Sequence, residues 1–101
     1  MALIVQKYGG TSVGDIDKIR AVAEKVSLSV KAGNRVVVVV SAMSGETNRL
    51  VNLAENFSDS KGSPLDMLLS TGEQVTISLL SMALREIARP ATPLCGWQVP
   101  I

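Results

Sequence analysis

The chain has 101 residues and a formal net charge of +1, with 47% hydrophobic and 3% aromatic residues. This length suffices for one small globular domain, and the near-neutral charge and few aromatic rings argue against a surface for nucleic acid or anionic membranes. The absence of histidine excludes a Ser-His-Asp triad and histidine metal ligands, and the single cysteine, Cys95, excludes an internal disulfide or a CxxC pair.

The first predicted element is a buried strand from Ala2 to Gln6, because this run is mostly apolar and glycines follow it closely. Such a short apolar start is not a signal peptide, and no apolar run in the chain approaches the length of a membrane span. We therefore expect a cytoplasmic protein that does not bind a membrane.

A helix is predicted from Asp15 to Ala32, with Asp15 as its N-cap and Gly33 as its stop. Its apolar residues recur at steps of three and four and form one stripe: Ile16, Ile19, Ala23, Val26 and Val30. Arg35 then introduces the consecutive valines 36–40, which predict a strand covered on both faces, as in a parallel sheet. Strand, helix and strand together predict a βαβ unit.

Two further helices are predicted after the valine strand. The first runs from Thr47 to Phe57, and its predicted inward residues are Leu50, Leu53, Ala54 and Phe57. The second begins at Ser63-Pro64, with the serine as a cap and the proline in the first turn. It continues from Leu65 to Ala88, with a break or kink expected at Gly72, and Pro90 ends it.

A cation, two glycines and two hydroxyls lie between the first strand and the first helix, as Lys7, Gly9, Gly10, Thr11 and Ser12. Glycines let a backbone approach a phosphate closely, and the free N–H groups at a helix start favour anions. Lys7 can stabilise charge on a transferring phosphoryl group. The spacing matches neither a Walker A loop nor GxGxxG. A tight glycine turn with a solvated lysine explains the same residues, and both interpretations remain open.

A second polar loop follows the valine strand directly. It begins at Ser41 and continues through Ser44, Gly45, Thr47 and Asn48. In a parallel sheet this loop opens on the same edge as the glycine segment, which is the edge where α/β proteins bind ligands. Helix capping by Ser44 or Thr47 explains these hydroxyls equally well.

Glu73 shares a predicted helical stripe with Ile77, Leu80, Leu84 and Ile87. A carboxylate at the end of an apolar stripe is expected to be partly buried and to need a cationic partner. The alternative is an acid that stabilises the first turn of a helix through the helix dipole.

Three segments, in order along the chain, carry a family resemblance. The segment from Lys7 to Val13 resembles the N-terminal signature of aspartate kinases, in the amino-acid kinase family, with Tyr8 where the family often has Phe. The segment from Ser41 to Asn48 resembles the family's second loop, and Ser70 to Gln74 resembles its third. Gly96-Trp97-Gln98 is similar to a further family segment, so the resemblance spans essentially the whole chain.

The resemblance implies a three-layer αβα fold with a mainly parallel sheet, which would be incomplete in this chain. Residues 1–101 would form the N-terminal portion of a catalytic domain, and the rest of that domain and the regulatory domains would lie beyond them. A third strand is expected from Leu94 to Val99, although Pro90, Pro93 and Pro100 are atypical there.

The family further implies ATP and Mg²⁺, with the metal held largely by the nucleotide and no metal ligand in this chain. Lys7 would be the catalytic residue. The nucleotide would bind at Lys7, Tyr8, Gly9, Gly10, Thr11, Ser12 and Ser41. The substrate would bind at Ser41, Thr47 and Glu73, with the glutamate on the α-ammonium group of L-aspartate.

The implied reaction is transfer of the ATP γ-phosphoryl group to the side-chain carboxylate of L-aspartate, which forms 4-phospho-L-aspartate for lysine, threonine and methionine biosynthesis. One alternative is another amino-acid kinase with a different acceptor, and a second is a non-catalytic domain that binds nucleotide or a partner protein. The complete enzyme is expected to be a homo- or hetero-oligomer, and residues 1–101 alone are expected to be inactive.

Overall fold

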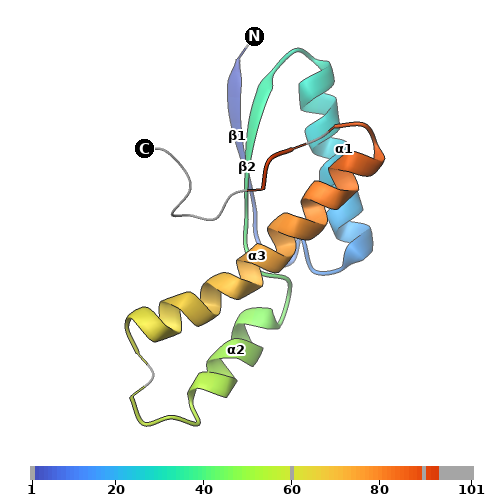
Figure 1. The fold of residues 1–101 in the computed structure, drawn as a ribbon. Helices are drawn as coiled ribbons and strands as arrows, with labels where there is room; N and C mark the ends of the chain where they lie inside the picture. The colour runs from blue at the N-terminus through green and yellow to red at the C-terminus, as the bar shows by residue number, and fades with distance from the viewer. Residues whose placement is uncertain (1, 60, 90, 94–101) are drawn as a thin grey trace.

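The computed structural model of the protein describes residues 2–59, 61–89 and 91–93. In chain order they form β1 (Leu3–Tyr8), α1 (Ile16–Lys31), β2 (Arg35–Val40), α2 (Glu46–Ala54) and α3 (Ser63–Glu86) (Figure 1). The predicted βαβ order and the two later helices are confirmed. The predicted strand at Leu94–Val99, the single cysteine and the helix-ending Pro90 lie outside the described residues.

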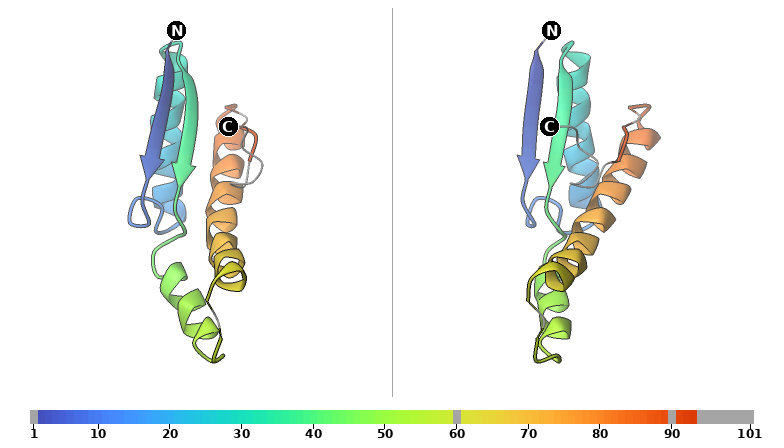
Figure 2. Two further views of the ribbon diagram at one scale, coloured as in Figure 1. Left: turned by 90° about the vertical axis from the view of Figure 1, so that its left-hand side faces the viewer. Right: turned by 60° about the vertical axis from the view of Figure 1, so that its left-hand side comes forward.

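The two strands pair in parallel, in a register that runs from Leu3 opposite Arg35 to Tyr8 opposite Val40. In both views of Figure 2 the strands point to the same end of the molecule, toward α2. Strand β1 continues two residues past the predicted end at Gln6, so Lys7 lies within the strand rather than after it. This register brings the segments after β1 and β2 to one edge of the sheet.

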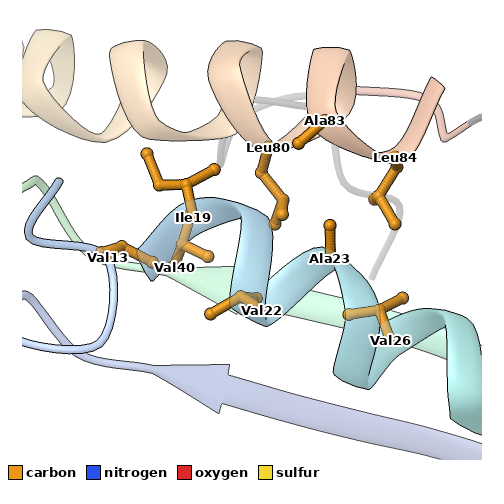
Figure 3. Close-up of a cluster of buried hydrophobic side chains, with 9 residues drawn as sticks. All are labelled: Val13, Ile19, Val22, Ala23, Val26, Val40, Leu80, Ala83 and Leu84. Carbon is orange, nitrogen blue, oxygen red and sulfur yellow. The ribbon is translucent and has the colours of Figure 1, made fainter. Parts of the chain in front are cut away.

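Helix α1 follows the prediction closely. The Asp15 carboxylate accepts a hydrogen bond from the Lys18 backbone N–H at 2.8 Å, and Gly33 follows the helix with a φ of 92°, which only glycine adopts readily. Val22 is buried although it lies outside the predicted stripe, because it points toward the sheet while Ala23 faces α3 (Figure 3). Ile16, predicted to face inward, is exposed in the first turn.

The core lies between α1, α3 and the end of β2 (Figure 3). Nine apolar side chains contribute to it: Val13, Ile19, Val22, Ala23, Val26, Val40, Leu80, Ala83 and Leu84. Near the C-terminal end of α3, an Arg20–Glu86 ion pair of 3.5 Å links the helix to α1, and an Arg89 Nε–Ser27 Oγ hydrogen bond of 3.2 Å links the segment just after it to α1. Helix α3 is thus fixed on α1 along its C-terminal half.

Helices α2 and α3 form a hairpin that extends beyond the end of the sheet (Figures 1 and 2). Helix α2 ends at Ala54, earlier than predicted, and only Leu50 and Ala54 of its predicted inward residues are buried. The prediction that Leu53 and Phe57 face inward is wrong, because α3 covers one side of α2 and Phe57 lies past the helix end.

Of the break or kink expected at Gly72, the break is absent, since α3 is continuous from Ser63 to Glu86. Pro64 occupies the first turn as predicted, but Gly62 rather than Ser63 takes the N-cap position. Length and composition would allow this helix to cross a membrane, contrary to the expectation from the sequence. A core helix can have the same properties, and α3 packs against α1 and α2 along its buried face.

One face of the sheet is covered by α1, and the opposite face is open within the described residues. The open sheet face, as we call it, consists of Leu3 (63% exposed), Val5 (64%), Val37 (47%) and Val39 (46%). The valine strand was predicted to be covered on both faces. A single βαβ crossover places its helix on one face only, and no described element covers the other. The described residues are therefore an incomplete part of an αβα architecture.

Candidate functional site

Two loops meet at the edge of the sheet where both strands end. The glycine loop, residues 9–14, joins β1 to α1, and the serine loop, residues 41–45, joins β2 to α2. Each loop therefore leads from a strand C-terminus to a helix N-terminus, where free backbone N–H groups and the helix dipole favour anions. This is the edge of an open parallel sheet at which ligands bind.

The glycine loop is anchored at one end and open at the other. Val13 is completely buried in the core, whereas Gly9, Thr11 and Ser12 are exposed. The Ser12 N–H donates to the Gly9 carbonyl at 3.0 Å and closes a turn. Within the described part of the chain, the Gly10 and Thr11 amides have no backbone acceptor, so they are available to an anion.

The two loops are in direct contact. The Ser44 hydroxyl donates to the Gly10 carbonyl at 3.4 Å, and a Cβ atom at Gly10 would lie 3.2 Å from the Ala42 carbonyl oxygen. A Cβ atom at Gly14 would likewise lie 3.4 Å from the Ser44 side chain. A side chain at Gly10 would need the serine loop to yield by a few tenths of an ångström, whereas one at Gly14 would be at the limit of ordinary contact. The absence of a side chain at Gly10 thus lets the two polar loops approach closely.

Lys7 and Tyr8, the last two residues of β1, are placed differently. Lys7 is exposed on the open sheet face, where it pairs in register with Val39. Tyr8 is half-buried on the face that α1 covers, and its hydroxyl donates to Gln6 Oε1 at 2.9 Å. Gln6 Nε2 in turn donates to the Ser29 hydroxyl on α1 at 2.8 Å.

The Tyr8 side chain therefore holds the strand to α1 rather than pointing to the open edge. Burial raises the pKa of its phenol above the ordinary value of 10.0. The Tyr8 carbonyl accepts the Ser41 N–H at 3.1 Å, which connects the ends of the two strands.

The third motif, Ser70 to Gln74, reaches the same region through α3. A Cβ atom at Gly72 would lie 2.9 Å from the Ala42 Cβ, so the helix backbone lies directly on the serine loop. The Ser70 and Thr71 hydroxyls donate within their own helix, to the Met67 carbonyl at 2.7 Å and the Leu68 carbonyl at 2.6 Å.

Glu73 is exposed, contrary to the expectation of partial burial. The buried stripe of α3 passes through Gly72, Thr76, Leu80 and Leu84, which is one position away from the predicted stripe at its N-terminal end. Glu73 lies beside that stripe, so its carboxylate is free of the core. Among the described residues, no Lys or Arg side-chain nitrogen lies within 4 Å of its carboxylate oxygens.

The structure brings the three predicted segments together, but it does not join their key side chains directly. Ser41 is half-buried and Thr47 is exposed at the first turn of α2. Within the described ranges, no hydrogen bond or ion pair connects the side chains of Lys7, Ser41, Thr47 and Glu73 to one another. The segments that carry these side chains therefore meet where Ala42 lies close to Gly10 and Gly72, while the side chains themselves are not bonded to one another.

Glu46 is a charged residue of the site that the sequence analysis did not identify. It begins α2, and Arg49 Nε donates to its carboxylate at 3.1 Å, which lowers the Glu46 pKa below the ordinary value of 4.5. The described residues contain no group of three His, Cys, Asp or Glu side chains that could hold a metal ion.

The sequence analysis also did not predict that Gly72 lies close to Ala42 and Glu46. A glycine within a long helical pattern has two readings, a break or a close packing contact, and periodicity alone does not separate them. The buried stripe of α3 runs without interruption from Gly72 through Thr76 and Leu80 to Leu84, which agrees with close packing at Gly72.

Known proteins resemble the chain over its whole length. Residues 2–101 match the model of the amino acid kinase family. The chain is 59% identical to the aspartokinase of Pseudomonas aeruginosa and 54% identical to aspartokinase 2 of Bacillus subtilis, in each case over 100% of this chain and 25% of the relative. It therefore spans about a quarter of the length of these curated relatives.

A solved structure agrees with the sequence comparisons. The crystal structure of aspartate kinase from Synechocystis superposes with a TM-score of 0.86 and 56% sequence identity, over 89% of this chain and 16% of that one. The family match covers all three polar segments. The chain belongs to the amino acid kinase family.

Proposed function

We propose that this chain forms part of the phosphate and substrate sites of an aspartate kinase, which transfers the γ-phosphoryl group of ATP to the side-chain carboxylate of L-aspartate. The product is 4-phospho-L-aspartate, which feeds lysine, threonine and methionine biosynthesis. The observation that carries this proposal is identity of 50–59% to aspartokinases across essentially the whole chain. The contact between the glycine and serine loops at one sheet edge supports it.

The glycine loop and Lys7 would serve the phosphate groups. ATP supplies the transferred phosphoryl group, and the Mg²⁺ bound with it supplies charge neutralisation. The amides of Gly10 and Thr11 have no backbone acceptor among the described residues and lie in the loop that leads to α1, and the hydroxyls of Thr11 and Ser12 are exposed beside them. Lys7 would stabilise the negative charge that develops on the transferred group.

The serine loop and α3 would serve L-aspartate. Ser41 offers a hydroxyl just after the end of β2, and Thr47 offers one in the first turn of α2. Ser41 would also contact the nucleotide. Glu73 offers a free carboxylate for the α-ammonium group, which is the one cationic group of the substrate. We further propose that the complete enzyme is an oligomer that acts in the cytoplasm.

The test uses a full-length chimera in which residues 1–101 replace the N-terminal quarter of the Pseudomonas aeruginosa aspartokinase. Product is trapped as the hydroxamate in the presence of ATP and Mg²⁺, with L-aspartate, L-glutamate or no acceptor. We expect hydroxamate with aspartate only. Product with another acceptor would favour a different amino-acid kinase, and nucleotide binding without product would favour a non-catalytic domain.

A further inference from the structure

Gly72 occupies an unfavourable place for its residue type. It lies inside α3, a continuous helix of 24 residues, where glycine is the least favourable residue apart from proline. Its φ is not in the left-handed region, so the backbone there does not require glycine. A glycine in this position is explained by what surrounds it rather than by its conformation.

Three atoms surround the place where a side chain would begin. A Cβ atom at Gly72 would lie 2.9 Å from Ala42 Cβ, 3.3 Å from Glu46 Cγ and 3.4 Å from Leu50 Cδ1. The first distance is shorter than real Cβ atoms show, whereas the other two concern side-chain atoms that can yield. The Ala42 methyl group would therefore clash with any side chain at position 72.

Ala42 is not free to move away. It is buried, it lies two residues after the end of β2, and its carbonyl oxygen faces Gly10 of the glycine loop at 3.2 Å from a Cβ position. A shift of Ala42 would move the serine loop against the glycine loop. A side chain at position 72 would therefore displace α3 instead.

We infer that Gly72 is a positioning residue for substrate binding, because its missing side chain lets α3 lie directly on Ala42 and thereby fixes Glu73 beside the serine loop. This inference rests on the proposed function, in which Glu73 binds the ammonium group of L-aspartate. Ser41 precedes Ala42 and Glu73 follows Gly72, so the contact of the Ala42 methyl group with the backbone at Gly72 sets the relation between two proposed substrate ligands.

The test is a double-mutant cycle in the full-length chimera. Gly72→Ala adds one methyl group, and Ala42→Gly removes the methyl group that it would meet. For Gly72→Ala we expect the KM for aspartate to rise about tenfold, with a much smaller change in the KM for ATP, since misplacement of a substrate ligand is costly. In the double variant we expect the KM for aspartate to return to within about threefold of the Ala42→Gly single variant.

A matched control is Ser78→Ala, which changes an exposed position of the same helix and should leave both KM values unchanged. If Gly72→Ala does not fold, folding of the double variant supports the inference, and failure of both contradicts it. An unchanged KM for aspartate in Gly72→Ala, or equal rises for both substrates without rescue, overturns the positioning role alone. A parent chimera that neither phosphorylates nor binds aspartate overturns the proposed function, and the positioning role with it.

Discussion

Lys7 and Tyr8 are neighbours in β1, yet their side chains lie on opposite faces of the sheet. Tyr8 is half-buried against α1 and its hydroxyl donates to Gln6, whereas Lys7 is exposed on the open sheet face. Alternation along a strand produces this division. Tyr8 thus contributes to the fold, and Lys7, just before it, supplies a charge at the edge where ligands would bind.

Replacement of Lys7 by alanine should lower kcat of the chimera by about a hundredfold or more, because electrostatic stabilisation of the transition state is lost. The core should be unaffected, since the Lys7 side chain is exposed. Steady-state kinetics and thermal melting measure the two effects. Lys25→Ala, at an exposed position of α1, is the matched control. Activity within a few-fold of the parent would show that Lys7 is not catalytic.

Replacement of Tyr8 by phenylalanine should lower stability and leave activity nearly unchanged, the opposite of what we expect for Lys7→Ala. The ring keeps its packing, and loss of the hydrogen bond to Gln6 should cost about 1 kcal/mol in the free energy of unfolding. Activity should stay within about threefold of the parent, because the Tyr8 hydroxyl is already hydrogen-bonded to Gln6. A large fall in kcat would instead place the phenol in the reaction.

The same pair of proteins tests the Tyr8 pKa. Burial raises this pKa in the folded state, so the stabilisation is fully present below the ordinary value of 10.0 and is lost as the pH rises through the higher folded value. We therefore expect the difference in stability between the parent and Tyr8→Phe to shrink above about pH 10. Denaturant melts at pH 8 and above pH 10 would measure it, and a difference that does not change with pH would contradict the shift.

Replacement of Glu73 by glutamine should raise the KM for aspartate much more than the KM for ATP, because the change removes the charge proposed to meet the α-ammonium group. Glu73 is exposed, so the melting temperature should change little. Glu24→Gln, at an exposed position of α1, is the control. Equal effects on both substrates, or an effect on the melting temperature alone, would favour a role for Glu73 in helix stability.

The sequence predicted the βαβ unit well because two independent signals agreed there. The period of the apolar residues identified α1, and Asp15 and Gly33 marked its ends. The parallel strands placed the polar loops on one edge, as the structure confirms. Local patterns identified each element, and the βαβ connection, which makes neighbouring strands parallel, then placed the two loops on one edge.

Features that depend on tertiary contacts were predicted less well. Phe57 and Leu53 have the spacing of inward residues, but α3 covers only one side of α2. Gly72 was taken for a break because its partner, Ala42, is distant in sequence. Glu73 was placed in the buried stripe because a shift of one position along a helix moves a residue by about 100°. Which face is covered depends on the neighbouring element and not on the pattern itself.

The open sheet face leads to a prediction about residues 1–101 expressed alone. Its four apolar residues are each at least 46% exposed, and no described element covers them or extends the sheet. Exposed apolar surface and unpaired strand edges favour self-association. We expect this polypeptide to bind a hydrophobic dye, to associate as its concentration rises and to show no detectable aspartate kinase turnover.

A matched pair of variants tests whether the open sheet face causes this association. Val5→Thr with Val37→Thr reduces apolar surface on that face while it keeps β-branched side chains, and light scattering should show less association. Met67→Gln with Met82→Gln changes two exposed residues of α3 and should have a smaller effect. If the two pairs of substitutions reduce association equally, the open sheet face is not its specific cause. A monodisperse preparation that melts cooperatively and phosphorylates aspartate would show that residues 1–101 already contain every group the reaction needs.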